Sequence, residues 1–80
     1  MKARIIVTLK NGVLDPQGKA IEGALKSLGV AGVESVRQGK IFEIELAATD
    51  SSDAQASLKL AAEKLLANLV IENYRCEILH

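Results

Sequence analysis

Hydrophobic and polar residues alternate at the start of the chain, between residues 2 and 10. One face of this extended segment carries Ala3, Ile5, Val7 and Leu9. The other face carries Lys2, Arg4, Thr8 and Lys10. This period of two residues predicts a strand with one buried face. Ile6 is the exception, because it is an apolar residue on the polar face and indicates a second buried surface there.

The next pattern has the period of a helix, and both of its ends are marked. Asp15 provides an N-cap oxygen, and Pro16 suits the first helical position because its fixed φ is already helical. Gly29 marks the end of the helix. The apolar stripe between these ends consists of Ala20, Ile21, Ala24, Leu25 and Leu28. Such a stripe predicts a helix that covers a sheet.

A second helix is predicted from about residue 50 to Asn68. Several possible N-caps lie at its start, in the run Thr49, Asp50, Ser51, Ser52 and Asp53. The two aspartates of this run also place carboxylates where the helix dipole favours negative charge. Its apolar face carries Leu58, Ala61, Ala62, Leu65 and Leu69. Leu60 and Leu66 widen this face beyond the needs of a lone surface helix, so we expect part of it to meet another subunit.

Two further segments alternate as strands do. In the middle of the chain, Phe42, Ile44 and Leu46 alternate with glutamates. We expect these glutamates to face Arg4 or Lys10 on a neighbouring strand. Near the end of the chain, Tyr74, Cys76 and Ile78 alternate with Arg75 and Glu77. Residues 33–47 leave two alternatives, because Gln38-Gly39 fits a turn or a bulge in one bent strand. We therefore predict a two-layer α+β fold, mainly antiparallel, with two helices on one face. The order is βαββαβ, or βαβαβ with one long bent middle strand.

Length and composition bear on the expected oligomeric state. A chain of 80 residues forms a single domain, residues 1–80, and such a domain buries only about 60% of its unfolded surface. The composition is 49% apolar, with Phe42 and Tyr74 as the aromatic residues. Small domains without disulfides or metals often gain stability by association. We therefore expect a homodimer or a higher homo-oligomer.

Charge and cysteine content argue against several classes of partner. Ten basic and ten acidic side chains give a formal net charge of zero, and no basic run is present, so no nucleic-acid partner is expected. RNA-binding modules of this plan stack bases on sheet aromatics, which this chain does not cluster. The apolar runs fall short of the ~20 residues needed to span a bilayer. With Cys76 as the single cysteine and no secretory pattern, we expect a cytoplasmic protein without membrane contact.

The segment from Gly12 to Lys19 has a superficial likeness to a phosphate-binding loop. That motif needs four residues between its glycines. It also needs a Ser or Thr after its lysine, because the hydroxyl of this residue holds magnesium. This chain has five residues between the two glycines, and Ala20 follows the lysine. We therefore interpret the segment as a capped turn from strand to helix.

The remaining candidates for chemistry are also weak. His80 is the last residue, so no surrounding side chains position it as a general base or a metal ligand. Cys76 lies at an apolar strand position without an activating histidine, which is typical of a core residue. Glu43 and Glu45 share one face of a strand, where ion pairs or solvation are commoner than catalysis. We predict no catalytic, metal or cofactor-binding residue in this chain.

The stretch from Val7 to Ile21 is the most informative part of the sequence. A strand ending in Leu-Lys, then Gly-Val-Leu-Asp-Pro-Gln-Gly, then a helix of Ala, Ile and Leu resembles the PurS family, the small subunit of phosphoribosylformylglycinamidine synthase. Residues 36–40, 42–45 and 65–72 resemble that family as well. The resemblance covers nearly the whole chain, and the segment Leu-Asp-Pro-Gln-Gly is its most specific part.

The resemblance implies a role in de novo purine biosynthesis without an active site in this chain. Proteins of this family form homodimers whose sheets join, and they associate with an ATP-dependent synthetase subunit, PurL, and a glutaminase subunit, PurQ. The complex is a ligase that converts formylglycinamide ribonucleotide, glutamine and ATP into the amidine, ADP, phosphate and glutamate. The resemblance thus implies no cofactor on this chain, with ATP and Mg²⁺ expected on the synthetase subunit. We expect the chain to bridge the two subunits and to support ammonia transfer.

Residues that match the motif are the candidates for partner contact. They are Lys10, Gly12, Val13, Leu14, Asp15, Pro16, Gln17 and Gly18. Leu14 and Gln17 are the best of these, because local structure demands neither residue at its position. A second candidate patch beside the predicted turn consists of Arg37, Gln38 and Lys40.

A regulatory domain of the ACT type is the alternative, since it shares the βαββαβ plan and binds small molecules at a dimer interface. It predicts that an amino acid stabilises the isolated fold, whereas the adaptor predicts little effect without protein partners.

Overall fold

The computed structural model describes residues 1–47 and 50–79, so the predicted cap Thr49 and the terminal His80 lie outside the described residues. In chain order the elements are β1 (Lys2–Leu9), α1 (Pro16–Ser27), β2 (Gly39–Glu45), α2 (Ser51–Ala61), the π-helical turn η1 (Ala62–Leu66) and β3 (Glu72–Leu79). The α+β prediction is confirmed. The order is βαβαβ, with a single middle strand, and residues 33–38 before it adopt no regular structure.

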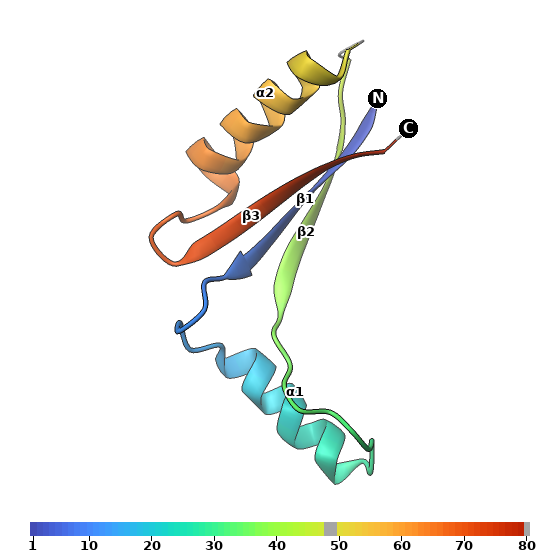
Figure 1. Cartoon of the computed structure of the whole chain (residues 1–80), viewed down its shortest axis with the longest axis vertical. Coiled ribbons are helices and arrows are strands. Elements are labelled where there is room, and N and C mark those ends of the chain that lie inside the picture. The colour runs from blue at the N-terminus through green and yellow to red at the C-terminus, as the bar shows by residue number, and fades with distance from the viewer. Residues whose placement is uncertain (48–49, 80) are drawn as a thin grey trace.

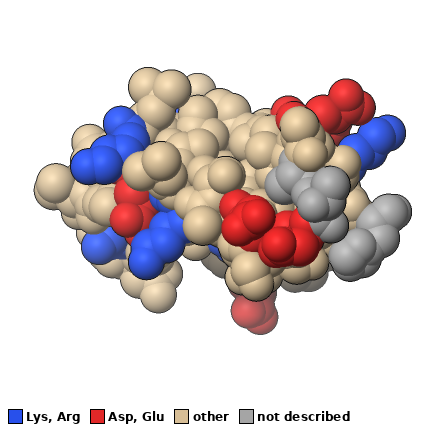
Figure 2. All heavy atoms as spheres, turned by 90° about the horizontal axis from the view of Figure 1, so that it is seen from above, with Lys and Arg blue, Asp and Glu red and all other residues tan. Residues whose placement is uncertain are grey.

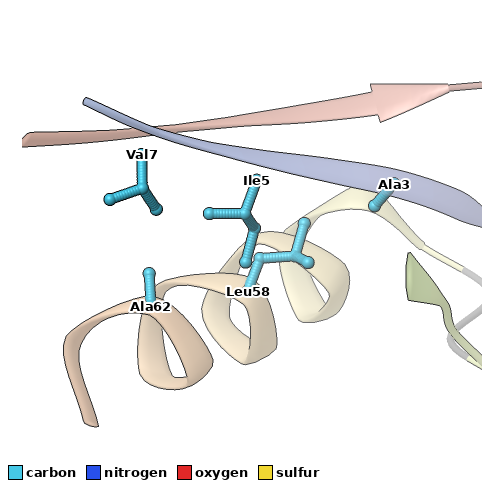
Figure 3. Close-up of a cluster of buried hydrophobic side chains, with 5 residues drawn as sticks. All are labelled: Ala3, Ile5, Val7, Leu58 and Ala62. Atoms are coloured by element: carbon cyan, nitrogen blue, oxygen red, sulfur yellow. The ribbon is translucent and has the colours of Figure 1, made fainter. Parts of the chain in front are cut away.

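The three strands form one antiparallel sheet in the order β2-β1-β3, with β1 in the centre. Ile5 lies opposite Phe42 on one side and Cys76 on the other. The predicted alternation of the first strand is confirmed, because its buried face packs against α2 (Figure 3). This core consists of Ala3, Ile5, Val7, Leu58 and Ala62.

The other face of the sheet carries the polar residues of β1. Arg4 lies opposite Glu43 of β2 and Glu77 of β3, and Lys2 lies opposite Glu45. We expected the two glutamates to face Arg4 or Lys10. This is confirmed for Glu43, which lies opposite Arg4. An antiparallel sheet commonly keeps one such polar face in solvent.

The placement of α1 differs from the sequence prediction. The expectation that both helices cover one face of the sheet is wrong for α1, which extends beyond the end of the sheet while α2 packs on it (Figure 1). Ile21 is 38% exposed and Leu28 is 77% exposed. The helix ends as predicted, since Gly29 has a φ of +81°. An apolar stripe indicates that a face needs cover, but it does not identify the covering surface.

The end of the second helix also differs from the prediction. The Ala67 N–H donates to the Ala62 carbonyl at 2.9 Å, which is the spacing of a π-helix and inserts one extra residue into the turn. Leu65 is rotated into solvent, where it is 83% exposed, and Leu66 packs against the core instead. Leu69 is 44% exposed because it lies in the loop that follows. The prediction that Leu65 and Leu69 share the buried stripe was therefore wrong.

Charged residues are spread over the surface. On the face shown in Figure 2, lysine and arginine side chains are interrupted by acidic and uncharged ones, so this face has no continuous basic track for a phosphate backbone. Among the described helices, none has the length and apolar character needed to cross a membrane.

Candidate functional site

The motif residues form the turn that connects β1 to α1. The Val13 N–H donates to the Lys10 carbonyl at 3.1 Å, and Gly12 has a φ of +87°, a left-handed conformation that favours glycine. The chain then reaches Asp15 and Pro16, which start α1 as predicted. This turn leaves the Leu14 side chain 70% exposed.

Asp15 joins two segments that are distant in sequence. One carboxylate oxygen, Oδ1, accepts the Gly18 N–H at 2.9 Å and caps the helix. The other, Oδ2, accepts the Gln38 N–H at 2.7 Å. Asp15 is only 8% exposed, and the bond from Gly18 is buried while the bond from Gln38 is partly buried. One side chain thus holds the start of α1 against the segment that leads into β2.

Arg37 makes a second connection between the same segments. Its Nη2 donates to the carbonyl oxygens of Leu9 and Lys10, at 3.1 Å in each case. These carbonyls lie just where β1 ends, and the Lys10 carbonyl also accepts the Val13 N–H. The two candidate patches found in the sequence, residues 10–18 and residues 37–40, therefore form one continuous surface.

Gly18 allows this close approach. A Cβ atom at this position would lie 2.6 Å from Asp15 Oδ2 and closer still to the Val36 carbonyl oxygen. Real Cβ atoms essentially never come this near to backbone or carboxylate atoms. Gly18 and Asp15 are therefore explained by the local structure, and they are not free to contact a partner.

A shallow hollow of about 200 Å³ lies beside this junction. Its lining is mixed, with apolar, acidic, basic and amide groups contributed by Val7, Leu9, Asp15, Gln17, Gln38, Gly39, Lys40 and Glu72. Sequence reasoning missed Glu72, which reaches the hollow because β3 lies antiparallel to β1 and begins where β1 ends. Among the candidates, Lys10 and Val13 are half-buried, and Asp15 and Gly18 are buried. The exposed candidates are Gly12, Leu14, Pro16, Gln17, Arg37, Gln38 and Lys40.

The electrostatics of Asp15 give a testable pH dependence. The Gly18 N–H, the Gln38 N–H and the Arg37 guanidinium hold the pKa of this carboxyl below its usual range, against the opposing effect of burial. The unfolded chain then binds the proton more readily than the folded chain, so acid favours unfolding.

We expect the stabilisation by Asp15 to be complete above about pH 5 and to be lost as the pH falls through the lowered pKa. The free energy of unfolding of Asp15→Asn should lie below that of the natural chain at neutral pH, and the two should converge in acid. Urea titrations at a series of pH values measure this difference. Two curves that stay parallel down to about pH 2 would contradict the assignment.

Groups with potential for catalysis are few in the described chain. Within residues 1–47 and 50–79, no three His, Cys, Asp or Glu residues lie close enough to hold a metal ion. Burial raises the pKa of the Cys76 thiol, which opposes formation of a nucleophilic thiolate. The Tyr74 hydroxyl donates to Glu63 at 2.6 Å, which raises the pKa of Tyr74 to about 12. This bond connects η1 to β3 and has a structural explanation.

Comparisons with known proteins agree with the resemblance seen in the sequence. Residues 2–80 match the family model described as PurS, phosphoribosylformylglycinamidine (FGAM) synthase. The PurS subunit of this synthase from Synechocystis sp. is 49% identical over 75 residues, which cover 94% of this chain and 75% of that protein. The corresponding subunit of Bacillus subtilis is 46% identical over 77 residues, covering 96% and 90%.

Solved structures show the same likeness in three dimensions. The PurS structure of B. subtilis has a TM-score of 0.83 at 44% identity and covers 99% of this chain and 98% of that one. A chain in the structure of PurLQS from Thermotoga maritima has a TM-score of 0.90 at 35% identity, covering 98% and 95%.

Proposed function

The chain belongs to the PurS family of subunits of FGAM synthase, the purine-biosynthesis enzyme, and from this premise we propose that it bridges the PurQ glutaminase and the PurL synthetase of that enzyme. It acts as an adaptor without an active site of its own. Its T. maritima relative lies in a PurLQS structure, which supports the choice of partners. The family assignment favours this role over an ACT-like regulatory domain.

The observation that carries this proposal is the surface built by residues 10–18 and 37–40. The Asp15 and Arg37 hydrogen bonds hold this surface in one shape, and Leu14 stands on it with 70% of its area exposed. A rigid surface that presents an apolar side chain loses little conformational entropy when a protein binds. We assign partner contact to Leu14 and Gln17, with Gln38 and Lys40 beside them.

The chemistry explains why such an adaptor is needed. Ammonia released from glutamine has to reach the phosphorylated amide before it is protonated or lost to water. Two active sites on separate subunits therefore need a fixed relative placement, which a small rigid protein provides. ATP and Mg²⁺ belong to the synthetase subunit in this scheme, and the assembly works in the cytoplasm.

The adaptor acts as a homodimer. Its fully buried core is small, comprising Ala3, Ile5, Val7, Ala54, Leu58 and Ala62. Exposed apolar residues remain around η1 and in the loop that follows it, where Leu65 and Val70 are each 83% exposed. A domain of this size commonly gains its missing stability from association.

Leu14→Asp tests the assigned surface. We expect this change to weaken the complex with PurL and PurQ by about ten-fold or more, because a charge replaces an apolar contact in a desolvated interface. Sedimentation velocity of the three-subunit mixture measures the effect, and circular dichroism checks that the variant is folded.

Leu28→Asp is the matched control, since Leu28 is 77% exposed, against 70% for Leu14, but lies at the far end of α1. We expect this variant to assemble as the natural chain does. Equal binding by Leu14→Asp and the natural chain would show that the partners use another surface. Absence of any complex with the natural chain would overturn the proposed function itself.

A further inference from the structure

The tip of the turn between β1 and α1 is an Asn-Gly pair. The Lys10 N–H donates to the Ile71 carbonyl at 2.8 Å, and Arg37 Nη2 donates to the Lys10 carbonyl at 3.1 Å, so the base of the turn is held in place. Asn11 and Gly12 follow, and both are exposed. Figure 1 shows this turn as the blue loop between the end of β1 and the start of α1. The pair therefore projects into solvent from an anchored residue.

The surroundings of Gly12 leave its backbone nitrogen free to react. In residues 1–47 and 50–79, no hydrogen bond is donated by the Gly12 N–H. A Cβ atom at this position would meet nothing within 4 Å, so the space beside it is open. A backbone nitrogen attacks the side-chain amide of a preceding asparagine most readily when its own residue carries no side chain. Gly12 is therefore a suitable nucleophile for the Asn11 amide.

The shape of the turn requires glycine after Asn11. Gly12 has a φ of +87° and Asn11 has a negative φ, in a turn closed by the bond from the Val13 N–H to the Lys10 carbonyl at 3.1 Å. These signs of φ are those of a type II turn, which needs glycine or asparagine at its third residue. The turn thus keeps beside Asn11 the residue type that makes an asparagine most reactive.

The charges near the pair favour an attack by the Gly12 nitrogen. The Arg37 guanidinium lies 3.1 Å from the Lys10 carbonyl, and Lys10 itself precedes the pair. A nearby cation stabilises the negative charge that develops when the Gly12 nitrogen gives up its proton. The carboxylates of Asp15 and Glu72, which line the hollow beside this turn, already accept backbone N–H groups.

We propose that Asn11 is a site of spontaneous deamidation, and that the altered turn supports partner binding less well. The Gly12 nitrogen gives up its proton and bonds to Asn11 Cγ, and the side-chain nitrogen leaves as ammonia, which takes up that proton. Water then opens the resulting succinimide ring at either carbonyl carbon. One opening gives aspartate, and the other gives isoaspartate, in which the main chain continues through the β-carbon. The balance is one water consumed and one ammonia released.

The turn slows this reaction only slightly. Ring closure rotates the backbone of Asn11, so the bond from the Val13 N–H to the Lys10 carbonyl has to open. The net strength of one hydrogen bond between neutral groups corresponds to a rate reduction of no more than about ten-fold. The bonds that Arg37 and Asp15 make lie on either side of the reacting pair and remain intact. The folded chain should therefore react at no less than about a tenth of the rate of the unfolded chain.

The other two asparagines of the chain lack these features. Asn68 Oδ1 accepts the Val70 N–H at 3.1 Å, and the residue that follows Asn68 is a leucine. Asn73 lies in β3 opposite Thr8, and a tyrosine follows it. Both following residues carry bulky side chains, and the strand holds the backbone of Asn73 extended. Asn68 and Asn73 are therefore internal controls for Asn11.

Deamidation changes the surface built by residues 10–18, and its effect on assembly rests on the proposed adaptor function. Both products add a negative charge beside Lys10 and Arg37, in a chain whose formal net charge is zero. The isoaspartyl product also lengthens the main chain by one carbon between Lys10 and Leu14. The bond that closes the turn then loses its geometry, and Leu14 is displaced relative to the junction held by Arg37. We expect the isoaspartyl form to bind PurL and PurQ about ten-fold more weakly.

Ageing of the isolated natural chain tests the modification site. The chain is held at about pH 8.5, both folded and in urea, and is then digested at acid pH, where the ring forms slowly. Mass spectrometry of the fragments locates each exchange of an amide NH2 for OH. We expect Asn11 in the folded chain to convert at least about ten-fold faster than Asn68 or Asn73. Conversion no faster than that of Asn73, or an Asn11 that converts in urea but stays intact in the folded chain, would overturn the proposal.

Asn11→Gln is the matched variant, because its longer side chain would have to close a larger ring and reacts far more slowly. It keeps the amide and the net charge. We expect its affinity for PurL and PurQ to be the same before and after ageing, whereas the natural chain should lose affinity in proportion to its isoaspartyl content. Sedimentation velocity measures the binding, and circular dichroism checks that each sample is folded. An aged natural chain that has converted Asn11 but binds as the fresh chain does would contradict the effect on assembly.

Asn11→Asp separates the two consequences of deamidation, since it adds the charge without lengthening the main chain. We expect its affinity to lie between those of the fresh natural chain and the isoaspartyl form, and an affinity as low as that of the isoaspartyl form would contradict the role of the main chain. The outcome is separable from that of the adaptor role. A fresh chain that binds neither PurL nor PurQ sinks only the adaptor, because the conversion of Asn11 is measured without partners. A fresh chain that binds both but retains Asn11 on ageing sinks only the proposed modification.

Discussion

Gly18→Ala should destabilise the chain by about 3 kcal/mol, although alanine is the better helix former. The added Cβ would lie 2.6 Å from Asp15 Oδ2 and 2.9 Å from Asp15 Cγ, and it would also meet the Val36 carbonyl oxygen. The Asp15 carboxylate accepts two hydrogen bonds, from the Gly18 N–H and the Gln38 N–H. Neither this carboxylate nor the Val36 backbone can move aside without breaking the hydrogen bond from Gln38. Urea unfolding followed by circular dichroism measures the change.

Gly23→Ala is the matched control in the same helix. A Cβ at Gly23 meets nothing within 4 Å, so only helix propensity changes. We expect this variant to be more stable than the natural chain by about 0.5 to 1 kcal/mol. Opposite signs for the two substitutions would support the packing at Gly18. If both variants gained stability, segment 33–38 would not lie against the start of α1.

Leu58→Ala should lower the free energy of unfolding by about 3 kcal/mol, which for a domain of this size leaves little stability. Leu58 is 1% exposed and is the largest side chain that α2 contributes to the core. It packs against Ile5 and its neighbours on β1, so truncation leaves a cavity in the centre of the fold (Figure 3).

Leu60→Ala is the control, because this leucine lies on the same helix but is 59% exposed. We expect a change within about 0.5 kcal/mol in the isolated chain. Chemical denaturation of both variants at equal protein concentration gives the comparison, since association contributes to apparent stability. Similar losses from both substitutions would mean that α2 presents a different face to the sheet.

Local patterns in the sequence were sufficient to predict much of the fold. The alternation of Ala3, Ile5 and Val7 identified the buried face of β1, and Asp15 with Pro16 identified the start of α1. These features depend on residues a few positions apart, where period and capping chemistry act directly. The α+β class followed from the order of such elements.

Features that depend on distant residues were not predictable. The bond from the Gln38 N–H to Asp15 spans 23 positions, and a capping aspartate gives no sign of a second donor. For the same reason, nothing in the sequence showed that residues 10–18 and 37–40 form one surface. The position of α1 depends on the contacts between these two segments. The sequence therefore predicted the amphipathic stripe of α1, but not where α1 lies relative to the sheet.

The π-helical turn changes the periodicity on which the prediction of the second helix depended. Leu65 falls on the buried stripe of a regular α-helix that contains Leu58 and Ala62, and one inserted residue moves Leu66 into that place. Residue types alone do not distinguish the two registers, since both positions are leucine. The exposed Leu65 is consequently available for association.

We proposed that this chain acts as an adaptor between PurQ and PurL, which couples glutamine hydrolysis to FGAM synthesis. The most direct measurement is FGAM formation by purified PurL and PurQ, with and without the chain, using glutamine or ammonium chloride as the nitrogen source. We expect the glutamine-dependent rate to require the chain and the ammonium-dependent rate to be independent of it. An undiminished glutamine-dependent rate in its absence would contradict the adaptor role.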